Sequence, residues 1–250
     1  MAAAAYLLVD ISNSFTKLAF ASRARLGRPF RIATPALTPK AIEAHLRQRD
    51  ARAVIVSSVV PAKNAAVRAA AGSRPAFFIN GSTPLGVGVD YPHPQTIGAD
   101  RLANAAAVAQ LYGRPAIVVD FGTAVTFDVV SRRGDYVGGV IAPGLEAMTS
   151  FLYQRTALLP RLTLREPARA IGRSTRAAMI SGAVYGYRGL VREIIARIRA
   201  ESFARGKVHI VATGGYARLI ARQLPEIDSV HEGLTLEGLR LIANLNLPAG

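Results

Sequence analysis

Two short stretches in different halves of the chain decide the fold: Tyr6-Leu-Leu-Val-Asp10-Ile-Ser-Asn-Ser14 and Ala116-Ile-Val-Val-Asp120-Phe-Gly-Thr-Ala124. Each is an apolar run that ends in an aspartate and leads into a turn of small residues, after which a second strand-like run begins. Each therefore predicts a β-hairpin with a carboxylate at the mouth of its turn. Superimposing Asp10 on Asp120 without a gap places Thr16 on Thr126, and this recurrence predicts a duplicated α/β domain.

The rest of the chain alternates between strand-like and helix-like runs, as expected for an α/β fold with mixed sheets flanked by helices. We expect two halves, 1–113 and 114–250, each resembling an ATPase domain. A loop rich in Gly and Pro covers 80–97. Further strands are predicted at 53–57, 76–79, 136–141 and 208–211. Helices are predicted at 39–49, 99–111, 174–199, 216–222 and 234–245, with others beginning at Pro61 and Pro143.

Composition excludes several classes of protein. Half of the 250 residues are hydrophobic, which suits a packed core, and no apolar run is long enough to span a bilayer. The chain has no Cys, so disulfides, thiolate metal sites and Cys nucleophiles are absent. No basic segment of the secretory type precedes Asp10, and we expect a cytoplasmic protein.

The net charge of +15 raises the question of nucleic acid binding. Only four of the 31 basic residues are Lys, the Arg are scattered along the chain, and no stacking aromatics lie between them. This pattern indicates a solvated basic surface that attracts small anionic substrates, and it disfavours a nucleic acid partner.

Three turns combine small residues with an acid or a hydroxyl at the end of a strand: 10–14, 120–124 and 213–215. Small residues let backbone N–H groups converge on phosphate oxygens, and an adjacent Asp suits a hard cation. Neither the P-loop pattern nor Gly-x-Gly-x-x-Gly occurs. One such turn is ordinary, but three in a duplicated frame predict a phosphate site of another kind.

The segment Gly98-Ala99-Asp100-Arg101 ends the long loop and opens a helix. Asp100 either caps the helix or accepts a hydroxyl proton, and Arg101 either pairs locally or holds an anionic group. The residues alone leave both interpretations open. The four His form no ligand-spaced pair, and no Gly-x-Ser-x-Gly elbow is present.

Taken in order, these motifs resemble those of the type III pantothenate kinases, which belong to the acetate/sugar kinase–chaperone ATPase–actin superfold. The family's Asp-x-Gly-Asn-Thr-x-x-Lys corresponds to Asp10-Ile-Ser12-Asn13-Ser14-Phe-Thr-Lys17. The other matches, in chain order, are Tyr91, Gly98-Ala-Asp-Arg101, Asp120-Phe-Gly-Thr-Ala124, Gly138-Gly-Val-Ile-Ala-Pro-Gly144, Ile171-Gly-Arg-Ser-Thr175, Thr213-Gly-Gly215 and Leu234-Thr-Leu-Glu-Gly-Leu239.

The resemblance implies two ribonuclease-H-like domains and the ATP-dependent phosphorylation of pantothenate, the first step of coenzyme A biosynthesis. It implies ATP, Mg²⁺ and a monovalent cation (K⁺ or NH₄⁺) as cofactors, and a homodimer in which Thr175 reaches the partner's site. Asp100 would be the general base, Asp10 would lie near Mg²⁺, and Asp120 would bind the monovalent cation. The implied nucleotide-binding residues are Asp10, Ile11, Ser12, Asn13, Ser14, Phe15, Thr16, Lys17, Gly122, Thr123, Gly214 and Gly215. The implied pantothenate-binding residues are Tyr91, Gly98, Ala99, Arg101 and Thr175. Small residues at Ala178, Gly182 and Gly186 predict either a dimer face or a core-packing helix.

The first loop departs from the family pattern, because Ser12 replaces its Gly and Ser14 its Thr. If position 12 needs a positive φ, Ser there costs about 1–3 kcal/mol. Two alternatives to an active pantothenate kinase remain open. In the first, Ser12 disables the loop, and the chain is a weak or inactive relative that acts as a regulatory accessory factor. In the second, the chain is a kinase that acts on another small hydroxylated substrate.

Overall fold

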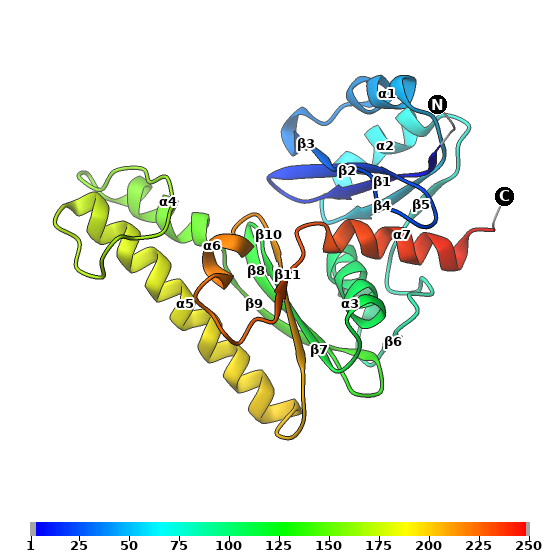
Figure 1. The fold of residues 1–250 in the computed structure, drawn as a ribbon. Coiled ribbons are helices and arrows are strands. Elements are labelled where there is room, and N and C mark those ends of the chain that lie inside the picture. Colours follow the sequence, from blue (N-terminus) through cyan, green and yellow to red (C-terminus); the bar gives the residue numbers. More distant parts are fainter. Residues whose placement is uncertain (1–3, 249–250) are drawn as a thin grey trace. The chain divides into compact units, whose positions relative to one another are not determined.

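The computed structural model describes residues 4–248, which form two sheets with helices around them (Figure 1). The first sheet has the strand order β3-β2-β1-β4-β5. Its strands are β1 (Ala4–Ile11), β2 (Phe15–Ala21), β3 (Phe30–Ala33), β4 (Ala51–Ser58) and β5 (Ala76–Phe78). The second sheet has the order β11-β10-β7-β8-β9-β6. Its strands are β6 (Gly88–Val89), β7 (Ala116–Phe121), β8 (Ala124–Val130), β9 (Asp135–Pro143), β10 (His209–Gly214) and β11 (Ser229–Val230).

The two sheets are built on one plan. Strand β1 pairs antiparallel with β2 and parallel with β4, and β7 pairs antiparallel with β8 and parallel with β10. The duplicated α/β fold predicted from the two Asp-ended runs is therefore confirmed. The longer helices are α1 (Pro39–Gln48), α2 (Asn64–Ala71), α3 (Ala99–Leu111), α4 (Leu145–Arg155), α5 (Thr175–Ser202), α6 (Ala217–Ala221) and α7 (Leu234–Asn246). Short 3-10 turns occur at Thr34–Ala36, Pro61–Lys63 and Pro94–Thr96.

The turns of the two hairpins differ in length by one residue. Ile11 lies opposite Thr16 in the first hairpin, whereas Phe121 lies opposite Val125 in the second. The ungapped match of Thr16 with Thr126 is therefore wrong beyond the turn. Lys17, opposite Asp10, is the structural counterpart of Thr126, opposite Asp120.

The chain divides into two compact units. Unit 1 comprises 1–113, 134–137 and 233–250, and unit 2 comprises 114–133 and 138–232. The sequence placed all of 114–250 in one half, whereas the structure groups the end of the chain with unit 1, because α7 packs against α3 there. Gly238 makes this close packing possible, since a Cβ at Gly238 would lie 2.0 Å from the Ala103 carbonyl oxygen. Thr235 adds a buried hydrogen bond to Asn104.

Each unit has its own apolar core. In unit 1 the alternate residues Leu7, Val9 and Ile11 of β1 face α1 and α2, as period-two strands with one such face covered require. In unit 2 one face of β7 and β8 packs with α5, whose Tyr187 ring lies 6.2 Å from that of Phe121. These cores fix the strand ends that carry the predicted site residues.

The structure corrects several predicted boundaries. Pro143 ends β9 and does not start a helix; Gly144 precedes α4, which begins at Leu145. Pro61 opens a 3-10 turn, and the helix proper starts at Asn64. Thr213 and Gly214 are the last residues of β10, so only Gly215 of that predicted turn lies beyond the strand. Among residues 4–248, no helix is both long and apolar enough to cross a membrane.

Candidate functional site

The first of the turns predicted to bind phosphate follows Asp10 and lies between β1 and β2 in unit 1. We refer to it as the first phosphate loop. The Ser12 N–H donates to the Phe15 carbonyl at 3.3 Å and closes the turn. Thr34, at the end of β3, donates from its hydroxyl to the Ser12 carbonyl at 2.6 Å and from its N–H to the Ser14 carbonyl at 3.0 Å. The Thr34 hydroxyl also lies 3.1 Å from that of Thr16. The loop is thus held in one conformation from the neighbouring strand, which the sequence analysis missed.

Ser12 is not strained. Every residue among 4–248 with a positive φ is a glycine, so the backbone at position 12 is one that Ser adopts freely. The strain considered from the sequence is therefore absent, and with it the strain argument that Ser12 disables the loop. What remains of the substitution is the space that its side chain occupies.

Asp10 is the last residue but one of β1 and is 3 % exposed. The strand register places Lys17 of β2 beside it on one side and Ser57 of β4 on the other. Residues directly opposite on neighbouring strands project from the same face of a sheet. The Ser57 hydroxyl is fully buried and has no hydrogen-bond partner within the described part of the chain. A carboxylate, an ammonium group and an unsatisfied hydroxyl therefore share one edge of the first sheet.

The second phosphate loop joins β7 and β8 in unit 2. The Gly122 N–H donates to the Ala124 carbonyl, and the Gly144 N–H donates to the Thr123 carbonyl, both at 3.1 Å. A Cβ at Gly144 would lie 2.2 Å from the Thr123 oxygen, so only Gly lets the start of α4 approach the loop. The Pro143-Gly144 pair therefore supports the loop, a role that the sequence analysis did not assign. The buried Tyr187 hydroxyl contacts the Pro143 carbonyl at 3.3 Å, and burial raises the pKa of Tyr187 well above its usual value.

Gly214 lies directly against Asp120. It has a φ of +92°, and a Cβ there would lie 2.6 Å from the Asp120 Oδ1 atom. The register also sets Thr213 beside Asp120, and the buried Thr213 hydroxyl has no partner within 4–248. Gly215, by contrast, is exposed, with open space where a Cβ would be. Unit 2 thus repeats the pattern of unit 1: an Asp at a strand end with a buried, unsatisfied hydroxyl on the next strand.

Gly98 opens α3, and its lack of a side chain makes room for Asp100. A Cβ at Gly98 would lie 2.5 Å from Asp100 Oδ1 and 3.4 Å from the Val59 side chain. Oδ1 accepts the Arg101 N–H at 2.9 Å, a local contact within the first turn. The interpretation of Asp100 as the helix cap is wrong, because Gly98 occupies the N-cap position and has no side chain to cap the helix there. Both Asp100 and Arg101 are half-buried, and Ala99 is buried.

Val59 links the first phosphate loop to this helix start. Its N–H donates to the Ile11 carbonyl at 3.0 Å, and its side chain packs beside Gly98. The end of β1 and the start of α3 therefore meet at one residue. Asp10 to Lys17 and Gly98 to Arg101, predicted separately from the sequence, are brought together within unit 1.

Tyr91 lies on the long loop and is half-buried. Its ring centroid is 6.1 Å from that of Tyr136, whose ring also lies 5.7 Å from the Arg101 guanidinium carbon. Tyr136 was not predicted as a site residue, because a Tyr in a strand is an ordinary core residue and its sequence neighbours carry no sign of a functional role.

Thr175 is the first residue of α5 and is exposed. Ser174 caps the helix by accepting the Ala177 N–H at 3.2 Å. Further along, a Cβ at Gly182 or Gly186 would meet nothing within 4 Å, and Ala178 is exposed. The small-residue stripe is exposed, while other residues of α5 pack into the core of unit 2. Helix α5 therefore does pack in the core, but the stripe takes no part in that packing within the single chain.

The residues present fit metal ions. Mg²⁺ is held in enzymes of this chemistry by one or two carboxylates together with substrate phosphates. Asp10 supplies a buried carboxylate, and the unsatisfied Ser57 hydroxyl beside it suits a bound water. Asp120 and the Thr213 hydroxyl beside it in the register offer oxygen atoms of the kind that a monovalent cation accepts.

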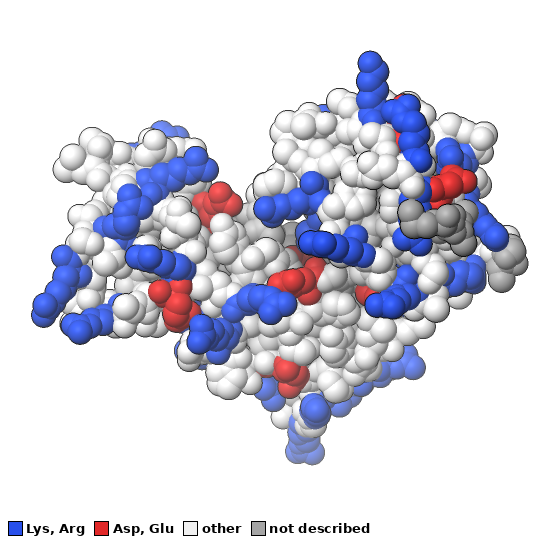
Figure 2. All heavy atoms as spheres, turned by 45° about the horizontal axis from the view of Figure 1, so that its top comes forward, with Lys and Arg blue, Asp and Glu red and all other residues white. Residues whose placement is uncertain are grey.

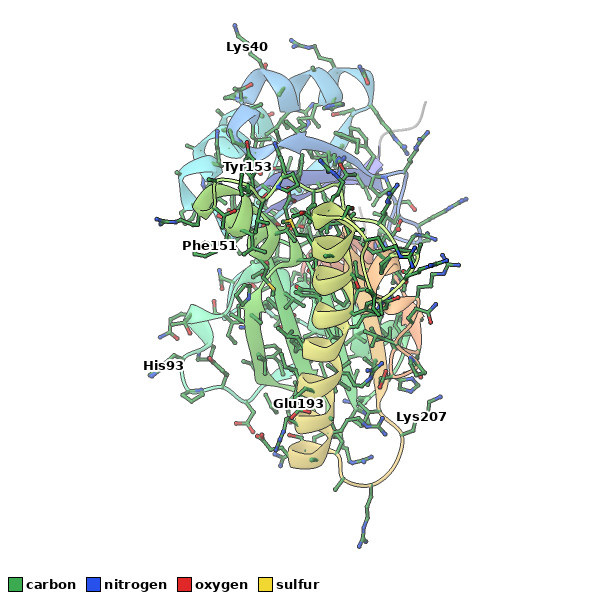
Figure 3. All side chains as sticks on the ribbon, turned by 90° about the vertical axis from the view of Figure 1, so that its left-hand side faces the viewer. Lys40, His93, Phe151, Tyr153, Glu193 and Lys207 are labelled. Atoms are coloured by element: carbon green, nitrogen blue, oxygen red, sulfur yellow. The ribbon has the colours of Figure 1, made fainter. Side chains whose placement is uncertain are left out.

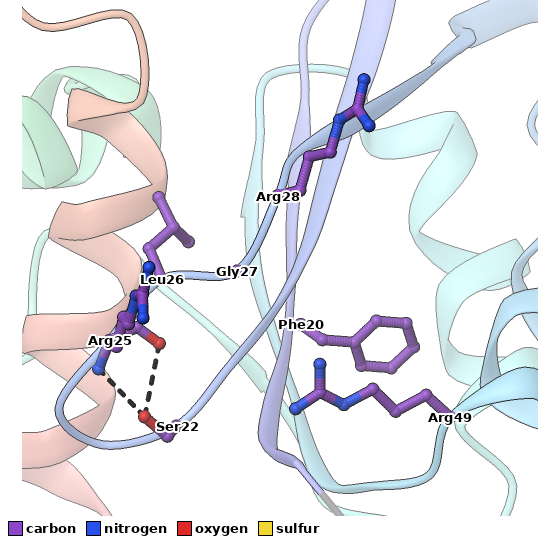
Figure 4. Close-up of a pocket in the computed structure, with 7 residues that line it drawn as sticks. All are labelled: Phe20, Ser22, Arg25, Leu26, Gly27, Arg28 and Arg49. Carbon is purple, nitrogen blue, oxygen red and sulfur yellow. Dashed lines mark hydrogen bonds between the residues drawn. The ribbon is translucent and has the colours of Figure 1, made fainter. Parts of the chain in front are cut away.

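One surface cavity, of about 260 Å³, lies elsewhere in unit 1 (Figure 4). The end of β2 and the loop that follows it line this cavity, together with Arg49. Phe20, Arg25 and Arg28 are among the lining residues. It contains none of the predicted site residues and is therefore not the candidate site. Basic side chains are also spread over the face drawn in Figure 2, with acidic ones between them.

Comparison with known proteins agrees with this geometry. A model of the type III pantothenate kinases matches residues 6–197. The chain belongs to the type III pantothenate kinase family. A type III pantothenate kinase of Akkermansia muciniphila is 50 % identical over 97 % of this chain and 99 % of its own length. Another, of Methylacidiphilum infernorum, is 44 % identical over 96 % of this chain and 88 % of its own length.

A solved structure has the same fold as this chain. A Sinorhizobium meliloti protein designated a 2-dehydro-3-deoxygalactonokinase superimposes with a TM-score of 0.65 at 16 % identity, covering 98 % of both chains. This likeness shows the duplicated fold expected from the sequence. As members of a kinase family, type III pantothenate kinases use ATP and a divalent metal.

Proposed function

We propose that this chain transfers the γ-phosphoryl group of ATP to the primary hydroxyl of pantothenate, the first step of coenzyme A biosynthesis. The observation that carries the proposal is the family match over residues 6–197. The intact Gly98–Arg101 and Asp120–Ala124 motifs, held in the conformations described above, support it. A cytoplasmic location, where ATP is available, is part of the same proposal.

Unit 1 supplies the groups that act on the hydroxyl and on one side of the phosphates. Asp100 accepts the proton of the attacking hydroxyl, and Tyr91, Gly98, Ala99 and Arg101 bind pantothenate. A guanidinium is suited to the carboxylate end of that substrate. Along the first loop, the residues Asp10, Ile11, Ser12, Asn13, Ser14, Phe15, Thr16 and Lys17 bind the ATP phosphates.

Unit 2 supplies the remaining groups. Gly122 and Thr123 contact phosphate, and Gly214 and Gly215 lie along the adenosine. Gly215 suits this role because it leaves open space at an exposed position. Asp120, with the Thr213 hydroxyl beside it, holds K⁺ or NH₄⁺.

The residues then share the work of phosphoryl transfer, in which positioning and charge stabilisation dominate. Bound Mg²⁺ neutralises charge on the phosphates, and Asp10 is the carboxylate that would hold it. Lys17, opposite Asp10 in the register, adds positive charge at the same edge. Asp100 takes up the hydroxyl proton, a contribution worth about 10²–10⁴-fold in rate for general bases.

The homodimer is also part of the proposal, and its support lies on unit 2. Large apolar side chains of α4 and the segment after it are exposed, among them Phe151 at 58 % and Leu158 at 90 %. Phe151 and Tyr153 are labelled on α4 in Figure 3. The outward-facing small residues of α5 allow close approach of a second helix. We assign this face, α4 with Ala178, Gly182 and Gly186 of α5, to the dimer, and Thr175 to the partner's pantothenate site.

A coupled assay of ADP release tests the proposed function. Purified protein with Mg-ATP should release ADP only when pantothenate is present. Replacing K⁺ by choline should lower the rate, which tests the Asp120 site. Two results would contradict the assignment. One is ADP release in the absence of pantothenate, and the other is ADP release that occurs with another hydroxylated acid but not with pantothenate.

A further inference from the structure

Tyr136 is a fully buried residue of β9 that contacts two side chains from different elements. The Arg101 guanidinium carbon of α3 lies 5.7 Å from the centre of its ring. The Tyr91 ring, on the long loop, lies 6.1 Å away at an angle of 58°, a tilted arrangement that aromatic pairs favour. One aromatic ring thus lies beside both of the side chains assigned above to pantothenate.

The backbone of Tyr136 holds the same loop. Its carbonyl accepts the Asp90 N–H at 2.9 Å, immediately before Tyr91, and Tyr136 is paired with Val89 in the sheet. One step earlier, Gly88 lies against Asp135 so closely that a Cβ would be 2.0 Å from Oδ1. Tyr91 is therefore anchored on both its backbone and its ring through the same strand.

Such anchoring matters because Tyr91 and Arg101 lie on different kinds of segment, an irregular loop and a helix. Tyr91 lies on a loop just after the short strand β6, whereas Arg101 lies on the first turn of α3. Side chains that bind one ligand must hold their relative position before it arrives, or binding must order them. A planar guanidinium over an aromatic ring also has a fixed orientation, which Lys does not reproduce.

We propose that Tyr136 is a positioning residue for the acceptor substrate: its ring sets the arrangement of Arg101 and Tyr91 and thereby the affinity for pantothenate. This inference rests on the proposed function. Tyr136 does not touch substrate in this account. Its effect falls on the binding of pantothenate, while the binding of ATP and the chemical step are left largely unchanged.

Steady-state kinetics of Tyr136→Phe, Tyr136→Leu and Tyr136→Met test it. The Leu and Met variants, which lack the aromatic face, should raise the KM for pantothenate by about tenfold while kcat and the KM for ATP change by less than about threefold. The Phe variant keeps the face and should stay within about twofold of wild type. Phe127→Leu is the matched control, because Phe127 is an equally buried aromatic residue of β8 that belongs to the core of unit 2.

The outcomes separate cleanly. A similar rise in the KM for pantothenate in Phe127→Leu would show a general effect of core damage and would overturn the inference. An unchanged KM in the Leu and Met variants, or failure of both to fold in thermal melts, would overturn it as well. A wild-type protein that does not phosphorylate pantothenate would contradict the proposed function instead, and is seen before any variant is made.

Discussion

Ser12 has an ordinary backbone conformation, so its consequence is steric alone. Its Cβ and hydroxyl occupy space in a loop assigned to the ATP phosphates, where the family has Gly. We expect Ser12→Gly to improve the use of ATP by a few-fold, seen as a lower KM for ATP or a higher kcat, because backbone N–H groups could approach the phosphates more closely. Titration of ATP at saturating pantothenate measures it, and identical constants in both proteins would show that the side chain does not crowd the nucleotide.

Gly98 determines where the Asp100 carboxylate lies. Its φ of −58° is open to any residue, so Gly98→Ala strains no dihedral, but the new Cβ would lie 2.5 Å from Asp100 Oδ1. The carboxylate must move, and a displacement of about 1 Å in a reacting group can cost about 10²-fold. We expect kcat to fall by about 10–100-fold with little change in the melting temperature. A variant with wild-type kcat would separate Asp100 from the chemistry or show that the carboxylate sits elsewhere when substrate is bound.

At the scale of elements, Arg188 ties α5 to the segment before it and to α6. Its buried guanidinium binds both Glu166 carboxylate oxygens, at 2.9 and 2.7 Å, and the carbonyls of Leu219 and Ile220. The hydrogen bonds from Arg188 lower the pKa of Glu166 below its ordinary 4.5. A depressed pKa contributes stability above the unfolded value, and this contribution disappears as the pH falls through the folded value.

Glu166→Gln should therefore lower the free energy of unfolding by about 1.5–3 kcal/mol near pH 7, the range for hydrogen bonds to charged groups. The difference from wild type should shrink as the pH falls below 4.5 toward the lowered pKa of Glu166 in the folded protein. Urea unfolding at pH 7 and pH 3.5 measures both. A difference that is equal at the two pH values would mean that the charge of Glu166 plays no part.

The long, strongly patterned elements were predictable from the sequence, whereas three of the shortest strands were not. The hairpins around Asp10 and Asp120 and the helices α1, α3, α5 and α7 carry their own period of apolar residues. Strands β3, β6 and β11 have four residues or fewer and are formed by pairing with neighbours that the local sequence does not reveal. Pro143 predicts a helix start because Pro tolerates the first turn of a helix, but in the structure it ends β9, and Gly144 precedes the helix.

The same distinction holds for the candidate site. Motif residues such as Asp100 and Gly214 were found from the sequence, since their residue types carry the chemistry. The residues that hold them were missed: Thr34 beneath the first loop, Gly144 beneath the second, and Tyr136 beneath Arg101. These act through contacts between distant segments, which a linear pattern does not contain.

At the scale of the whole molecule, the duplicated fold explains why the end of the chain returns to unit 1. Helix α3 comes after the strands of the first sheet, with β6 of the second sheet in between, and α7 comes after β11, the last strand of the second sheet. The two helices pack together. The Leu234–Leu239 motif thus supports α3, which carries Asp100 and Arg101 in its first turn, through the buried hydrogen bond from Thr235 to Asn104.

The dimer assignment makes a prediction at this scale. Gly182→Glu adds a charge where the α5 face meets open space, so it should leave the single chain folded and weaken the dimer. Sedimentation of the two proteins should give a monomer for the variant, and the KM for pantothenate should rise because Thr175 is lost from the partner's site. Ala200→Glu, exposed near the other end of the same helix, is the matched control. A variant that sediments as wild type does would move the interface away from this stripe.

The central claim is that the chain phosphorylates pantothenate with Asp100 as the base. The most direct test is ADP release with Mg-ATP and pantothenate for wild type and Asp100→Asn, with 4'-phosphopantothenate identified by mass. Wild type should form the product, and the variant should lose about 10²–10⁴-fold in kcat while its KM for ATP stays the same. A variant that retains wild-type turnover would contradict the role of Asp100, and a wild type that forms no phosphopantothenate would contradict the account as a whole.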